Sequence, residues 1–129
     1  MDTCFNALLL DAERGLRATP TGAEIDVRLP WYRSLPISVV EVGGLSVDGQ
    51  AIPSSDIRFE VNGKSFQLDE LPAHPGEFWF VLDSSVLRLP ALRLQPGTNH
   101  DVELQLNLYP PYVPHLKWVT KVRKTLHAR

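Results

Sequence analysis

Hydrophobic and polar residues alternate with a period of two along three stretches of the chain. Residues 23–29, 57–61 and 102–108 each carry an apolar side chain at every second position. Successive side chains of a β-strand point to opposite faces, so each stretch predicts a strand with one apolar and one polar face. Residues 78–82 and 86–89 are apolar on both faces, which predicts strands that are covered on both sides or that lie at an interface.

Turn residues separate these stretches. Asn62-Gly63 joins the strand at 57–61 to a second strand at 64–68, and this dipeptide tolerates the positive φ angles of a tight hairpin. Asp48-Gly49 and Pro96-Gly97 also indicate turns. A short turn near 68–71 is the sole helical feature expected. The pattern predicts an all-β fold, an antiparallel sandwich of about eight to nine strands, as a single domain over residues 1–129.

Composition agrees with one soluble globular domain. The 129 residues are 43% hydrophobic and 22% charged, with a net charge of −2, which argues against disorder and against a nucleic-acid surface. The single cysteine, Cys4, cannot form an internal disulfide, so we expect a cytoplasmic protein. The apolar run 7–10 is too short for a signal peptide or a membrane span, and it predicts a buried first strand instead.

The residues that could carry chemistry do not form a recognisable site. The four histidines are His74, His100, His115 and His127. They are not at the spacing of zinc ligands, so we expect no metal on this chain. Ser84 and Ser85 lack a nucleophile elbow and suggest a polar turn. The neighbouring carboxylates Asp69 and Glu70 point apart in an extended chain and fit the capping of a short turn better than acid–base work. No catalytic residue is assigned.

Two segments, 28–36 and 109–115, place aromatic rings among prolines. Proline removes backbone donors and stiffens the chain, so both segments should leave the sheet and present rigid rings. Two interpretations remain open: a partner interface or active-site wall, and a cap on the end of the core. The candidate interface residues are Pro30, Trp31, Tyr32, Arg33, Tyr109, Tyr112, Pro114 and His115.

The last part of the chain is basic. It contains no acid after Glu103, and its cations are Lys117, Lys121, Arg123, Lys124 and Arg129. Such a run can be a solvated face, can protect an exposed sheet edge, or can dock on an acidic partner.

Four segments together resemble a known family. They are RLPWYRSLPIS at 28–38, LSVDGQAIPSSDIRFEVNGKSFQLDEL at 45–71, YPPYVP at 109–114 and KTL at 124–126. These segments are similar to the small (β) subunit of bacterial C-glycoside deglycosidases. The similarity spans most of the chain, and the central block is its most specific part.

The resemblance implies a hetero-oligomer of αβ units whose larger α subunit has a sugar-isomerase-like barrel. That α subunit carries a divalent metal, expected to be manganese, and a histidine base. The substrate is a C-glycoside already oxidised at sugar C3. Loss of the acidified C2 proton gives an enolate that expels the aglycone by β-elimination. The small subunit is then non-catalytic, and the two aromatic-proline segments would dock on the α subunit.

Two other functions remain as alternatives. The chain could be a carbohydrate-binding or interaction-type sandwich whose exposed rings stack on sugars, or an enzyme in its own right. The first lacks a secretion signal, and the second lacks a catalytic motif.

Overall fold

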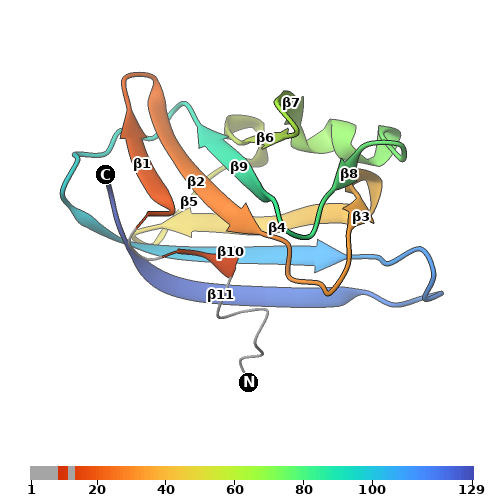
Figure 1. Cartoon of the computed structure of the whole chain (residues 1–129). Coiled ribbons are helices and arrows are strands. Elements are labelled where there is room, and N and C mark those ends of the chain that lie inside the picture. Colours follow the sequence, from red (N-terminus) through yellow and green to blue (C-terminus); the bar gives the residue numbers. More distant parts are fainter. Residues whose placement is uncertain (1–8, 12–13) are drawn as a thin grey trace.

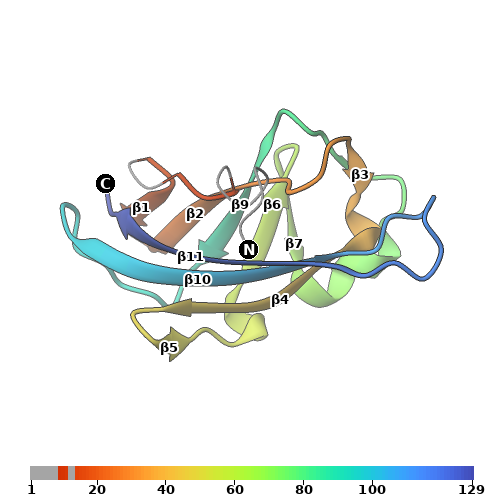
Figure 2. The ribbon, with the colours of Figure 1, turned by 90° about the horizontal axis from the view of Figure 1, so that it is seen from below.

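Two antiparallel sheets stack face to face in the computed structural model, which describes residues 9–11 and 14–129 (Figures 1 and 2). The five-stranded sheet has the order β1 (Leu16–Thr19), β2 (Gly22–Arg28), β9 (Ser84–Leu89), β6 (Arg58–Val61) and β7 (Lys64–Gln67). The four-stranded sheet has the order β11 (Trp118–His127), β10 (Asn99–Leu108), β4 (Val40–Val47) and β5 (Gln50–Ala51).

A pair of two-residue strands, β3 (Leu35–Pro36) and β8 (Phe78–Trp79), forms a third, small sheet at one end. Three short 3-10 turns complete the described secondary structure: η1 (Ile37–Val39), η2 (Ser54–Asp56) and η3 (Leu68–Ala73). The predicted all-β class and antiparallel sandwich are confirmed. The described part has eleven strands, more than predicted, and the additional strands include the two-residue strands β3 and β5.

The alternating stretches form the inner faces of the sandwich. On β2 the apolar residues Ala23, Ile25 and Val27 are buried while Arg28 is exposed, and on β10 the four alternate residues from Val102 to Leu108 are buried. Burial of one face stabilises this register, because a slip of one residue would turn every apolar side chain towards solvent.

The hairpin predictions are confirmed. Asn62 and Gly63 join β6 to β7 with φ angles of 54° and 75°, and Asp48 and Gly49 join β4 to β5 with φ angles of 54° and 80°. The 3-10 turn η3 occupies the predicted helical turn. Its capping is also as predicted, because the Glu70 carboxylate accepts a hydrogen bond of 2.8 Å from the Gln67 amide.

Three local predictions are wrong. The strand expected at 78–82 ends at Trp79, and the residues after it form a loop held by Asp83 N–H donating to the Phe80 carbonyl at 2.9 Å. Ser84 and Ser85 begin β9 instead of forming a turn, because Ser84 pairs with Arg28 of β2. Of the run 7–10, the first two residues lie outside the described residues, and Leu9 and Leu10 are buried in the core without joining a strand.

Candidate partner-binding surface

The two aromatic-proline segments meet at one end of the sandwich. Trp31 follows β2, Tyr112 lies in the loop between β10 and β11, and the Trp31 indole N–H donates a hydrogen bond to the Tyr112 hydroxyl. Trp31 also contacts Trp118 edge-on, with 5.4 Å between ring centroids. Trp31 is only 9% exposed, so its ring caps the core, whereas Tyr112 remains exposed beside it.

A cation also contacts the ring of Tyr112. The guanidinium carbon of Arg33 lies 4.9 Å from the centroid of the Tyr112 ring, a distance at which a cation–π interaction is favourable. Tyr32, whose ring centroid is 5.2 Å from that of Trp31, is exposed. Hydrogen bonding to Tyr112 raises the pKa of Tyr32 above its ordinary value. The exposed rings are therefore fixed in place by Trp31 and Arg33.

Tyr109 is anchored separately, on the outer face of the four-stranded sheet. Its hydroxyl donates to Glu41 Oε1 at 3.0 Å, and Asn107 Nδ2 donates to the same oxygen at 2.7 Å. The Asn107 bond, and after it the Tyr109 bond, lowers the pKa of the Glu41 carboxyl. Asn107 in turn accepts a hydrogen bond of 3.1 Å from Gln105. This ladder fixes the base of the loop that carries Tyr112.

The tip of that loop contains the other predicted residues. Pro114 and His115 are exposed, and His115 adopts a left-handed backbone with a φ of 62°. An open hollow of about 450 Å³ lies against the loop and is lined by residues that include Tyr109, His115 and Lys117. Pro30, in contrast, is buried beside Trp31. The structure thus brings the two segments together but divides them into a buried cap and an exposed surface.

The other three histidines each contact neighbouring side chains of this domain. His100 lies between Asp48, at 2.7 Å from Nδ1, and Thr98, at 2.7 Å from Nε2. His127 contacts Asn99 at 2.8 Å, and His74 packs against the ring of Phe66. Among the residues that the structure describes, no group of three or more His, Cys, Asp or Glu side chains could hold a metal ion.

Three of the five basic residues, Lys121, Arg123 and Lys124, lie on β11, an edge strand of the four-stranded sheet. Arg123 pairs with Asp101 at 2.6 Å and with Glu103 at 3.4 Å, and Lys124 donates to the carbonyl of Leu10 at 2.9 Å. Two of the five cations are therefore used inside the domain. Within the described residues, no helix is both long and apolar enough to cross a membrane.

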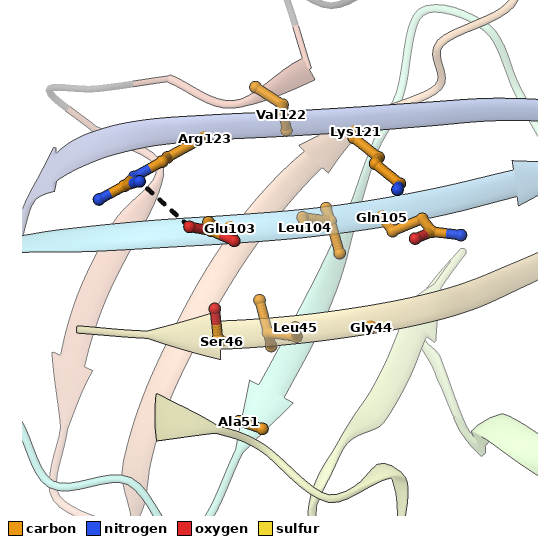
Figure 3. A pocket seen from close by; sticks show the side chains of 10 residues that line it. All are labelled: Gly44, Leu45, Ser46, Ala51, Glu103, Leu104, Gln105, Lys121, Val122 and Arg123. Atoms are coloured by element: carbon orange, nitrogen blue, oxygen red, sulfur yellow. Dashed lines mark ion pairs between the residues drawn. The ribbon is translucent and has the colours of Figure 1, made fainter. Parts of the chain in front are cut away.

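A second hollow, of about 500 Å³, lies over β4, β10 and β11 (Figure 3). Glycine at position 44 leaves this part of the sheet uncovered, because nothing lies within 4 Å of where its Cβ would be. Lys121 and Gln105 border the hollow on one side, and the Arg123–Glu103 ion pair borders it on the other. The residues lining it include no aromatic ring on which a sugar could stack.

Sequence reasoning missed three exposed residues at the same end as the aromatic loops. Phe78, Phe80 and Leu82 are exposed, and the backbone amide of Val81 donates to Ser34 Oγ at 2.9 Å, which ties their loop to the Trp31 segment. The signal was present, because the apolar run 78–82 was compatible with an interface. A period-two pattern cannot distinguish an exposed apolar side from a covered one.

Comparison with known proteins first gives the class, because the similar proteins are named as beta subunits of deglycosidases. Residues 13–112 match the family model described as C-glycoside deglycosidase beta subunit. A protein of that name from Microbacterium trichothecenolyticum is 41% identical over 98 residues, which cover 76% of this chain and 74% of that one. One from Arthrobacter globiformis is 39% identical over 102 residues, covering 78% of each chain.

A Microbacterium protein named 3'-dehydrocarminate deglycosidase beta subunit is also similar. It is 39% identical over 99 residues, which cover 77% of this chain and 74% of that one. With these matches, the chain belongs to the family of C-glycoside deglycosidase beta subunits. The resemblance found in the sequence is confirmed, and membership as a beta subunit implies a partner subunit.

Proposed function

We propose that this chain is the non-catalytic subunit of a heteromeric, cytoplasmic lyase that cleaves the carbon–carbon glycosidic bond of 3-oxo-C-glycosides. Its role is to stabilise a larger α subunit with a sugar-isomerase-like barrel and to form part of the wall around that subunit's active site. Support for the substrate class comes from the similar protein whose name specifies a 3'-dehydro substrate. Support for the cytoplasmic location comes from the lone cysteine.

The proposed reaction is a β-elimination. A 3-oxo group acidifies the C2 proton, and a base on the α subunit removes that proton. The electron pair from the C2–H bond forms a C1–C2 double bond while the bond between C1 and the aglycone breaks. The aglycone carbon takes up a proton, so no water is consumed. A divalent metal is expected on the α subunit, and among the residues described here no group of three or more His, Cys, Asp or Glu side chains could hold one.

The observation that carries the docking role is the rigid aromatic surface built from the two loops. Trp31 anchors the surface in the core, and Tyr32 and Tyr112 project from it beside Arg33. Tyrosine, tryptophan and arginine dominate the energetics of protein interfaces, and pre-ordered rings lose little conformational entropy when they bind. The histidines 74, 100 and 127, in contrast, are held by neighbours within this domain.

Co-expression with the larger subunit tests the proposal. We expect the two chains to co-purify, and we expect Tyr112→Ala to weaken assembly by about 2 kcal/mol because it removes an exposed ring at the docking surface. The matched control is Val119→Ala, which removes an exposed apolar side chain from the outer face of β11. Failure of the wild-type chains to co-purify, or full activity and stability of the larger subunit alone, would contradict the proposal.

A further inference from the structure

The loop between β8 and β9 exposes apolar side chains beside the docking loops. Phe80 and Leu82 alternate with the half-buried Val81, so both point away from the core, and Phe78 on β8 is exposed as well. The loop has a defined shape. Asp83 N–H bonds to the Phe80 carbonyl, and the Trp79 indole donates to the Asp83 carbonyl at 3.0 Å. The exposed side chains therefore belong to an ordered loop.

This loop and the Trp31 loop form one surface. Val81 N–H donates to Ser34 Oγ, and Leu35 pairs with Trp79 where β3 meets β8. Both ribbon views place the 29–34 and 80–83 loops next to each other at this end of the sandwich, on the same half of the molecule as the 109–117 loop (Figures 1 and 2). We name the apolar end surface by its five exposed residues: Tyr32, Phe78, Phe80, Leu82 and Tyr112.

The apolar end surface is large enough to supply much of the area that one partner contributes to a standard protein interface. Its side chains are 40% to 79% exposed. At ~200 Å² for a fully exposed side chain of this size, they leave ~550 Å² open to water. That area approaches the upper end of what monomeric proteins expose as one patch. It is about two-thirds of the ~800 Å² that each partner contributes to a standard interface.

We infer that the larger subunit covers the apolar end surface, and that Phe80 and Leu82 are its anchors on this chain, together with the aromatic loops. The inference rests on the proposed function, because the partner is the larger subunit of the deglycosidase. It adds a third segment to the interface and predicts that the partner presents an apolar contact surface there.

Binding of the larger subunit to the full-length chain tests the inference. The double variant Phe80→Ser with Leu82→Ser should raise the Kd about 100-fold, because each anchor contributes a factor of about ten. The matched control is Val119→Ser, which removes an exposed apolar side chain from the outer face of β11 and should leave the Kd within about threefold. Amide hydrogen exchange of the wild-type chain supplies a readout that needs no variant, and exchange at 80–83 should slow in the complex.

The outcomes separate this inference from the proposed function. An unchanged Kd and unchanged exchange at 80–83, with Tyr112→Ala still weakening assembly, would overturn the inference and leave the proposed function intact. A wild-type pair that does not bind would overturn the proposed function itself. The double variant could instead abolish self-association of this chain and leave the Kd for the larger subunit unchanged. That result would show that a second copy of this chain covers the apolar end surface, and it would overturn the inference.

Discussion

Tyr112→Phe removes one hydroxyl and leaves the ring that stacks on Arg33. The structure makes this a test of the bond between the Trp31 indole and the Tyr112 hydroxyl, because that hydroxyl is the indole's hydrogen-bond acceptor. Trp31 is 9% exposed, so water has little access to its N–H group. A buried donor left without an acceptor costs about 1–3 kcal/mol. We expect a loss of about 1–2 kcal/mol in the free energy of unfolding.

Urea unfolding of the full-length chain measures this loss as a lower midpoint with an unchanged m-value. The matched control is Tyr32→Phe, which removes a hydroxyl from a more exposed ring and should lower the midpoint less, because the Trp31 indole keeps its acceptor on Tyr112. The pKa of Tyr32 gives a second readout, because hydrogen bonding to Tyr112 raises it. In Tyr112→Phe that pKa should fall towards its ordinary value in an NMR titration. A Tyr112→Phe midpoint equal to that of the wild type would show that the bond to the Trp31 indole does not stabilise the fold.

Three further predictions test other parts of the account. Gly43→Ala should cost about 1–2 kcal/mol in urea unfolding, because its Cβ would lie 2.8 Å from the hydrogen-bonded Asn107 amide, whereas Gly44→Ala has open space and should be tolerated. The hydrogen bond to His100 lowers the pKa of Asp48. The stability that this bond gives the wild type is therefore present above the ordinary aspartate pKa and is lost as the pH falls through the lowered pKa. Asp48→Asn should lack this pH dependence in acid unfolding. Glycosides at millimolar concentration should leave the tryptophan fluorescence of the chain alone unchanged, and saturable quenching would favour the carbohydrate-binding alternative.

The elements of the fold that could be predicted are those that a local pattern of residues determines. Alternation identified β2, β6 and β10 because one face of each strand is buried, and the Asn62-Gly63 and Asp48-Gly49 turns need only local backbone geometry. The short strands β3 and β5 were missed and β8 was predicted too long, since two-residue pairings depend on tertiary contacts that leave no period in the sequence.

The residue types of the candidate surface could be predicted from the sequence, but the arrangement of their side chains could not. Prolines and aromatic residues indicated loops that leave the sheet, yet the sequence could not separate Trp31, which caps the core, from Tyr32 and Tyr112, which stay exposed. That difference depends on Trp118, which is 87 residues further along the chain and packs edge-on against the Trp31 ring. The exposure of Phe80 and Leu82 likewise follows from where the loop is tied to Ser34.

The non-catalytic role proposed for this chain is tested by the turnover of a 3-oxo-C-glycoside by the larger subunit, measured with increasing amounts of this chain. We predict negligible turnover by either chain alone and full turnover when the two are mixed. The Tyr112→Ala variant should reach the same kcat at saturation but require a higher concentration, because its defect is in assembly. Turnover by this chain alone would contradict a non-catalytic role. So would a lower kcat at a saturating concentration of the Tyr112→Ala variant, if that variant binds the larger subunit as tightly as the wild type does.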